Sequence, residues 1–194
     1  MKIDVCIPAK KYNMYQEDLV FSWLTEIGIP VNNVFVCDVK GLANARNKLM
    51  QRVETKWFLF LDDDIKINKD WWKEIKKHTK NPKVGAINGL PISDSWILNL
   101  LRSILLLRGI KYQRGFTSNT LIRRKAVEGI MLKRQGRLED LELQEKIKAN
   151  GYEWKFVRAY CKHTKKGNVL WKDSWSDFKI LCKEKGLVKA LMMI

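Results

Sequence analysis

The sequence predicts an α/β protein in which a mostly parallel sheet carries helices on both faces. Short apolar runs alternate with longer amphipathic runs through the first half, as in successive strand–helix–strand units. One apolar run ends abruptly in acids, in the stretch WFLFLDDDIKI at 57–67, although the chain is otherwise basic. With 194 residues, 46% of them hydrophobic, the chain is long enough for one compact domain with a buried core.

The first half holds the alternating elements, and local signals bound several of them. The expected strands are 2–8, 33–38, 56–62 and 83–92, and the expected helices are 17–28, 41–53 and 69–80. The first strand stops at Pro8, and the first helix ends at Gly28. Asn68 or Asp70 opens the third helix, because both residue types cap helix N-termini well.

A different pattern begins at about residue 95. The expected elements there are a helix in 96–110, a strand in 115–124, a helix in 138–151, a strand in 152–161 and an amphipathic helical stretch over 171–194. We expect one compact domain with three parts, which are 1–94, 95–168 and 169–194. No uncharged apolar run reaches about 18 residues, which predicts no transmembrane helix, and the N-terminus lacks a signal-peptide pattern.

The composition narrows the function classes. Lys and Arg number 37 against 21 Asp and Glu, for a net charge of +16, which fits a nucleic acid, an anionic membrane, a phosphate-bearing substrate or simply a solvated basic surface. No helix-turn-helix, zinc-finger or RNA-binding motif appears, which argues against nucleic acid. The four cysteines lie far apart without a CxxC pair, which predicts buried free thiols in a reducing compartment.

Three acids follow the third expected strand at the point where it stops. Ligands of open parallel sheets bind beyond the carboxyl ends of the strands, which is where Asp62, Asp63 and Asp64 lie. Alternation along a strand predicts that Asp62 and Asp64 point the same way and that Asp63 points away. Two converging carboxylates repel each other, and Mg²⁺ or Mn²⁺, shared with substrate phosphates, removes that repulsion. The alternative is an exposed acidic turn that caps the next helix.

The neighbouring strand ends also carry polar residues. Asp38 ends the second strand, and Lys10 follows Pro8 at the end of the first. The stretch GLANARN at 41–47 opens a helix, whose N-terminus favours an anion, but its single glycine makes neither a P-loop nor a dinucleotide fingerprint. Arg46 is a candidate contact to a phosphate or a base, and the alternative is a surface arginine on a helix.

Six stretches together resemble the GT-A fold glycosyltransferases, especially family 2. The stretches VCIPAKK, VFVCDVKGLANARN and KWFLFLDDDIKI resemble the half of that fold that binds the nucleotide-sugar. The stretches RGFTSNTLIRRKAVEGI and GRLEDLELQEKIKANGYEWKFV resemble the acceptor half, and CKHTKKG resembles the late histidine segment. The resemblance runs in order over residues 3–167 and implies a GT-A fold with 1–94 as the donor half and 95–168 as the acceptor half.

The resemblance implies roles for the matched donor residues. The implied donor-binding residues are Pro8, Lys10, Asp38, Arg46, Asp62 and Asp63, and the implied ligands of Mn²⁺ or Mg²⁺ are Asp62, Asp64 and His163. Within these sets, Asp38 would contact the nucleotide base, Arg46 would help to hold the donor, and Asp64 would bind the metal that bridges the diphosphate. The sequence departs from the family after the second strand, where DVKGLAN keeps one acid only.

The acceptor half supplies the implied catalytic residues. Asp140 in LED would be the general base of an inverting transfer, with Glu139 as the alternative base, and Ser118 and Asn119 would lie on the acceptor side. Both acids open a helix, whose dipole favours ionised carboxylates and so keeps a base deprotonated, although simple helix capping is an alternative. The chemistry agrees, because a metal neutralises the diphosphate leaving group and a base activates the acceptor hydroxyl. A retaining mechanism stays open.

The leading hypothesis is therefore a metal-dependent glycosyltransferase that uses a nucleotide-diphosphate sugar and a sugar, lipid or protein acceptor. The alternatives are a nucleotidyltransferase, which normally needs a Gly-rich loop that IPAKKYN lacks, a basic nucleic-acid-binding protein, and a relative that only binds nucleotide-sugar. We expect a cytoplasmic protein with peripheral membrane contact. Trp171, Trp175, Phe178 and Cys182 lie at helical spacing among lysines, as in helices that bind anionic membranes, although packing against the sheet explains them equally.

Overall fold

The computed structural model describes residues 1–9, 15–92, 114–133 and 138–163, together with 179–180, 182–183 and 186. The strands are β1 (Ile3–Pro8), β2 (Val31–Cys37), β3 (Trp57–Leu61), β4 (Ile65–Lys66), β5 (Val84–Ile92), β6 (Asn119–Arg123) and β7 (Glu153–His163). The helices are α1 (Tyr15–Glu26), α2 (Leu42–Arg52), α3 (Lys69–Lys76), the 3₁₀ helix η1 (Arg124–Val127) and α5 (Glu139–Ala149). Lys10 and the expected helix 96–110 lie outside the described residues.

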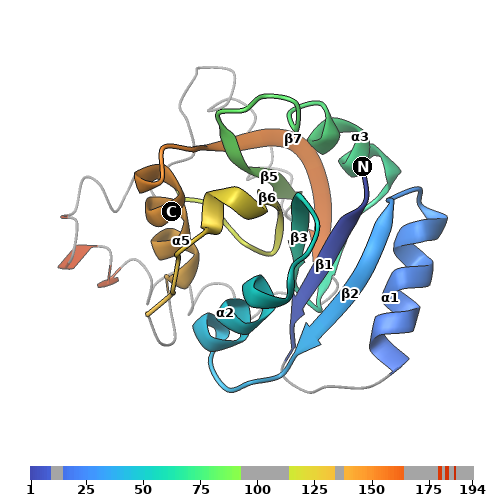
Figure 1. Cartoon of the computed structure of the whole chain (residues 1–194), viewed down its shortest axis with the longest axis horizontal. Helices are drawn as coiled ribbons and strands as arrows, with labels where there is room; N and C mark the ends of the chain where they lie inside the picture. Colours follow the sequence, from blue (N-terminus) through green and yellow to red (C-terminus); the bar gives the residue numbers. More distant parts are fainter. Residues whose placement is uncertain are drawn as a thin grey trace.

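The strands form one sheet in the order β2-β1-β3-β6-β5-β7-β4 (Figure 1). β1 pairs in parallel with β2 and β3, and β5 pairs in parallel with β7. β6 lies between β3 and β5 and is antiparallel to both, and β4 is antiparallel to β7. Five strands thus run in one direction, which confirms the mostly parallel sheet, while β6 and β4 run in reverse.

Helices cover both faces of the sheet, as predicted. Side chains alternate along β3, so that Leu59 and Leu61 join the cluster that contains Trp71 of α3, while Phe58 and Phe60 join the cluster that contains Leu49 of α2. Burying each such side chain contributes about 1.5–3 kcal/mol to folding. In Figure 1, α1 lies on one side of the sheet, and α2 and α5 lie on the other.

Several element boundaries differ from the sequence-based expectation, among them the start of β6 and the end of α3. β6 begins at Asn119 and not at 115, because the backbone N–H groups of Gly115 and Phe116 donate to side chains and not to a neighbouring strand. α3 begins as predicted, since the Asn68 side chain accepts a hydrogen bond of 2.9 Å from the Trp71 N–H, but it ends at Lys76. The two-residue strand β4 is too short to show a periodic pattern in sequence.

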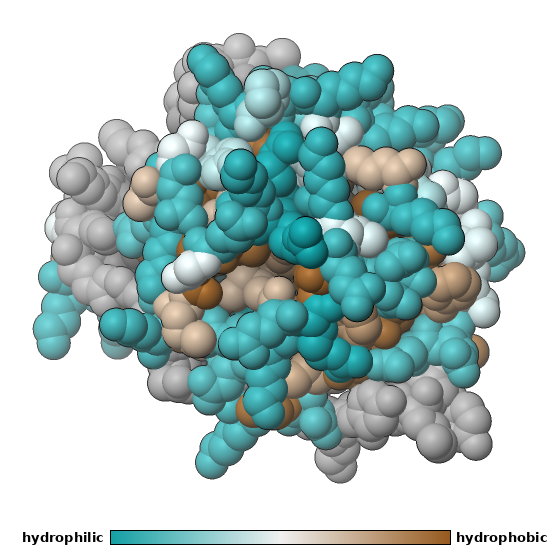
Figure 2. Space-filling view, viewed as in Figure 1, coloured by the Kyte–Doolittle hydropathy of each residue, from teal (hydrophilic) through white to brown (hydrophobic). Residues whose placement is uncertain are grey.

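The polarity of the surface and the state of the cysteines can be compared with what the composition predicts. Hydrophilic side chains cover most of the face in Figure 2, and apolar side chains gather in a hollow near its centre. Cys6 and Cys161 are buried free thiols, as expected, whereas Cys37 and Cys182 are half-buried. Among the residues that the structure describes, no helix is both long and apolar enough to cross a bilayer.

A few residues of the expected amphipathic tail belong to the described part of the chain. Ile180 and Cys182 are partly buried and pack against Leu138 and Leu141 at the start of α5. The neighbouring Lys179 and Lys183 are exposed, so at these positions the apolar side of the tail faces the protein. Trp171, Trp175 and Phe178 lie outside the described residues. Peripheral membrane contact stays a prediction, which liposome co-sedimentation can contradict by showing no binding.

Candidate active site

The first part of the site is the acid turn, residues 62–64, which follows β3 directly. The Ile65 N–H donates to the Asp62 carbonyl at 3.1 Å, so the acids lie in a turn and not in a continued strand. The Asp62 N–H in turn donates to the Ser118 carbonyl at 3.0 Å. Asp62 and Asp64 are partly buried and Asp63 is exposed, and which of the three acids face a metal stays a prediction.

The ends of β1 and β2 lie at the same edge of the sheet as the acid turn. Pro8, the last residue of β1, is buried and pairs in register with Cys37, the last residue of β2. The Ala9 N–H continues the pairing by donating to the Cys37 carbonyl at 2.9 Å. Asp38 follows immediately and is exposed. The structure therefore places Pro8 and Asp38 beside each other, at a strand edge that is open to a ligand.

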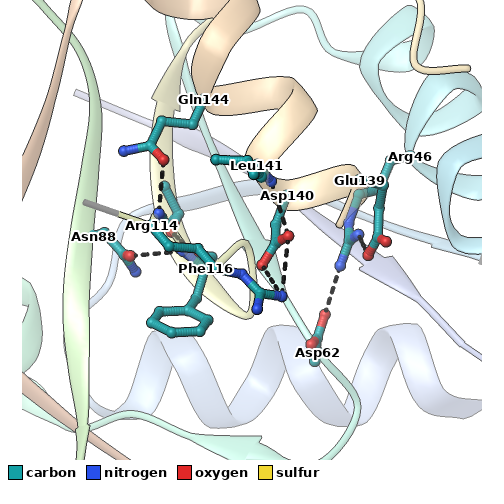
Figure 3. A network of polar contacts seen from close by, with 11 residues as sticks. Arg46, Asp62, Asn88, Arg114, Phe116, Glu139, Asp140, Leu141 and Gln144 are labelled. Atoms are coloured by element: carbon teal, nitrogen blue, oxygen red, sulfur yellow. Dashed lines mark hydrogen bonds and ion pairs between the residues drawn. The ribbon is translucent and has the colours of Figure 1, made fainter. Parts of the chain in front are cut away.

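Arg46 connects the acid turn to the second part of the site. It projects from α2, which follows Gly41 with φ of 92°, a backbone conformation that favours glycine. Its guanidinium Nη2 lies 3.6 Å from Asp62 Oδ1, and Nη1 donates to Glu139 Oε1 (Figure 3). The side chain is only 3% exposed, so the surface-arginine interpretation is wrong.

The acid pair, Glu139 and Asp140, is the second part of the site and forms the first turn of α5, as predicted. Both residues are buried. Arg114 Nη2 lies 3.3 Å from Asp140 Oδ2 and 3.4 Å from Oδ1, and Asp140 Oδ1 accepts a 2.8 Å hydrogen bond from the Leu141 N–H (Figure 3). Each acid of the pair therefore has its own arginine partner.

Burial changes the acidity of Asp140 in the direction opposite to our expectation. Loss of solvent has the largest effect and raises the pKa of its carboxyl. Arg114 lowers this pKa, and the negative charge of Glu139 raises it. The Leu141 N–H and Arg46 lower it further, but the net pKa is still raised because burial prevails. The helix start therefore does not keep the pKa of this carboxyl at an ordinary value. A buried carboxylate with a raised pKa is a stronger base than an exposed one.

The acid turn has its own unusual acidity. Burial raises the pKa of Asp62 to about 6, Arg46 opposes the rise, and the negative charges of Asp64, Asp63 and Glu139 add to it. Asp62 Oδ1 is buried without a hydrogen-bond partner in the described structure. A buried carboxylate oxygen among further acids is a site that a cation would stabilise.

The described acids fit a divalent metal that takes part of its coordination from substrate. Within the described ranges, no three acidic, histidine or cysteine side chains converge closely enough to hold a metal by themselves. His163 is the last residue of β7 and pairs in register with Ile65, directly after the acid turn, and its side chain lies outside the described part. Mg²⁺ and Mn²⁺ commonly use one or two carboxylates plus phosphate oxygens, which Asp62 and Asp64 can provide.

The loop before β6, residues 114–118, holds Arg114 against the acid pair. The Gly115 N–H donates to Gln144 Oε1 at 2.9 Å, and the Phe116 N–H donates to Asn88 Oδ1 at 3.0 Å (Figure 3). Three residues of this arrangement, Arg114, Asn88 and Gln144, were not predicted from the sequence. A signal existed for Asn88, which is a polar residue inside the apolar run of β5, since buried polar side chains almost always have a bonding partner.

Glycine is required within this loop. A Cβ atom on Gly115 would lie 2.4 Å from the Trp154 ring, so the backbone can approach the ring only without a side chain. Ser118 is half-buried, and its carbonyl holds the acid turn.

Asn119 does not have the acceptor-facing position that we predicted. It is completely buried, its amide donates to Cys161 Sγ at 2.7 Å, and its Oδ1 accepts from Asn88 at 3.3 Å. Because both of its polar groups are used inside the sheet, Asn119 joins β6 to β5 and β7.

A pocket of about 310 Å³ opens beside the acid turn, a volume at the lower end for small-molecule sites. Its lining residues are Ile7, Val20, Trp23, Leu61, Asp62, Asp63, Ile65 and Lys66. The two acids and Lys66 are the charged residues among mostly apolar walls from α1, β1, β3 and β4.

The comparisons with known proteins identify the family and the fold. The model of the family "Glycosyl transferase family 2" matches residues 29–131, more than half of the chain, and this range includes Asp38, Arg46 and the acid turn. The acid pair and His163 lie beyond the matched range. A search of curated proteins finds no match.

Three solved structures share the fold. A mannosyltransferase from Pyrobaculum calidifontis, in complex with GDP-Man and Mn²⁺, has a TM-score of 0.65 and 14% identity over 98% of this chain and 68% of that chain. Glucosyl-3-phosphoglycerate synthase from Mycobacterium tuberculosis, with Mn²⁺ and UDP, has a TM-score of 0.59 and 12% identity over 98% and 78%. S. aureus TarS with UDP-GlcNAc has a TM-score of 0.55 and 14% identity over 100% and 70%. The GT-A fold is thereby confirmed.

Proposed function

The chain belongs to glycosyl transferase family 2, and from this premise we propose a metal-dependent glycosyltransferase that moves a sugar from a nucleotide-diphosphate donor to an acceptor hydroxyl. One observation carries the proposal. Arg46 holds the acid turn and the acid pair together, although they come from opposite halves of the chain. Glycosyl transfer needs carboxylates that bind a metal at the leaving group and a carboxylate that accepts the proton of the acceptor hydroxyl. The two groups of acids can provide these functions side by side.

The donor side of the proposal rests on the edge formed by β1, β2 and β3. Asp38 and Pro8 would contact the nucleotide, while Asp62 and Asp64, with His163, would hold Mn²⁺ or Mg²⁺. The bound metal supplies Lewis-acid neutralisation of the diphosphate leaving group. The similar mannosyltransferase and TarS structures contain GDP-Man and UDP-GlcNAc, both nucleotide-diphosphate sugars, which supports this donor class for the present chain.

The acceptor side of the proposal assigns the base to Asp140. The acceptor hydroxyl gives its proton to the Asp140 carboxylate while its oxygen bonds to the anomeric carbon, and the bond from that carbon to the diphosphate oxygen breaks with inversion. Glu139 is the alternative base, since each of the two acids has its own arginine partner. The choice of Asp140 rests on its raised pKa, because burial makes its carboxylate a stronger proton acceptor than an exposed aspartate.

Asp64→Ala tests the proposal, with Asp63→Ala as the matched control from the same turn. We expect one nucleotide-sugar to raise the melting temperature of the wild type only with Mn²⁺ present, because the metal and diphosphate bind together. The shift and Mn²⁺-dependent donor hydrolysis should disappear in Asp64→Ala and fall much less in Asp63→Ala, because Asp63 is not a predicted metal ligand. Full Mn²⁺-dependent activity in Asp64→Ala, or release of pyrophosphate from a nucleoside triphosphate, would contradict the proposal.

A further inference from the structure

We propose that Arg46 is a positioning residue that couples the charge of the acid turn to the acid pair, and that it is not a direct ligand of the donor. In its catalytic part this inference rests on the proposed function. Its electrostatic part concerns the binding of Mn²⁺ alone. The coupled groups are Asp62 on one side of the guanidinium and Glu139 on the other.

The guanidinium of Arg46 is buried between the two groups of acids and is hydrogen-bonded to Glu139. Nη1 donates to Glu139, Nη2 faces Asp62 at 3.6 Å, and Nε is buried without a hydrogen-bond partner in the described structure. The side chain is 3% exposed, so a donor phosphate that drew Nη1 away would replace the contact with Glu139 by one with the donor. That exchange would leave a buried carboxylate without its cation, which is strongly unfavourable.

Two acids, Asp62 and Glu139, share the single positive charge of Arg46 unequally. The contact to Glu139 is a direct hydrogen bond, while the contact to Asp62 is a longer ion pair. When a metal neutralises Asp62, the guanidinium interacts with Glu139 alone, and that pair becomes stronger. Coupling of this kind is reciprocal, so the charge of Glu139 must change the metal affinity of the acid turn by the same factor.

The start of α5 has a backbone conformation that depends on contacts of this kind. Leu138, directly before Glu139, has φ of 63°, and it is the only residue other than glycine with positive φ among those described. This left-handed conformation is unfavourable for leucine and persists only where surrounding contacts impose it. Leu138 is buried, and the bond from Arg46 to Glu139 holds the next residue.

The neighbouring residue on α2 provides a neutral comparison. The Asn47 side chain donates to the Leu132 carbonyl at 2.9 Å and accepts from the Leu132 N–H at 2.8 Å. Asn47 therefore also joins α2 to the acceptor half, but without charge. If the coupling between the two groups of acids is electrostatic, removing the contacts of Asn47 should leave Mn²⁺ affinity unchanged. Removing the charge of Arg46 or of Glu139 should change that affinity.

The experiment measures Mn²⁺ affinity of the full chain, without nucleotide, by electron paramagnetic resonance of free Mn²⁺. We expect Glu139→Gln to weaken Mn²⁺ binding about fivefold or more, because Arg46 then repels the metal without compensation. Arg46→Met should tighten Mn²⁺ binding by a similar factor and lower kcat, while Asn47→Ala should change the affinity less than about twofold. In the Arg46→Met background, Glu139→Gln should no longer weaken binding.

If Arg46 instead contacted the nucleotide-sugar directly, the results would differ. Arg46→Met would then weaken nucleotide-sugar binding, and Glu139→Gln would leave Mn²⁺ affinity unchanged. Either result overturns the coupling. If Arg46→Met does not fold, Arg46→Lys replaces it as the test variant. Because lysine keeps the positive charge, this variant should keep the Mn²⁺ affinity and lower kcat. A large loss of Mn²⁺ affinity in Arg46→Lys would contradict the coupling. If the wild type binds Mn²⁺ but transfers no sugar, only the proposed function is contradicted. If it transfers sugar but Arg46→Met and Glu139→Gln do not change Mn²⁺ affinity in opposite directions, only the coupling is contradicted.

Discussion

The acid turn and the acid pair use the same residue type in contrasting surroundings. The acid turn is a partly exposed reversal at the end of a strand, in which three carboxylates follow one another and two of them are predicted to face a cation. The acid pair lies buried in the first turn of a helix, and an arginine contacts each of its carboxylates. The difference indicates that exposure suits the first group to binding a metal with its diphosphate, and that desolvation suits the second to moving a proton.

Asp140→Asn is the strongest way to separate the two groups. The amide keeps the shape of the side chain but cannot accept a proton at neutral pH, so kcat should fall by about 10²–10⁴. Because the acid turn is untouched, Mn²⁺-dependent binding of the donor should persist in thermal-shift measurements. Asp70→Asn, at an exposed position of α3, is the control and should leave both quantities unchanged. Loss of donor binding in Asp140→Asn would break the proposed division of roles.

Protons should compete with metal at the acid turn. Since burial raises the pKa of Asp62 to about 6, Mn²⁺ affinity should fall about tenfold for each unit of pH below that value. Above it the carboxylate is ionised, and the affinity should level off. Titrations between pH 5 and 7.5 measure this slope, and Asp62→Asn should bind more weakly but with less dependence on pH. A flat wild-type profile would show that Asp62 is not a ligand.

The acid pair should set the acid limb of activity. A base works when ionised, so kcat at saturating Mn²⁺ should fall as pH drops through the pKa of Asp140, which burial places above the ordinary aspartate value. Arg114 lowers this pKa, so Arg114→Met should move the acid limb to higher pH. We expect this shift to be the smallest of the three effects. Movement of the limb to lower pH would indicate a different base.

Local sequence was sufficient for much of the fold. Strand β3 and helix α5 are visible in sequence because a period of two or of about 3.6 residues is a local property. The acids after β3 and at the start of α5 were found for the same reason, since a strand end and a helix start are local features. By contrast, β4 has two residues and shows no period, and nothing within β6 indicates its reversed direction.

Tertiary structure alone decided how these pieces act together. The partners of Arg46 and the contact of Arg114 with Asp140 join residues that lie far apart in the chain, so no local pattern contains them. The role of Asn119 also depends on distant residues. We predicted an acceptor contact for it, but its side chain forms hydrogen bonds inside the sheet with Asn88 and Cys161. The sequence by itself determined which chemical groups stand at strand ends and helix starts. Burial and long-range pairing decided their charges and roles, because desolvation and ion pairing depend on every element packed around a group.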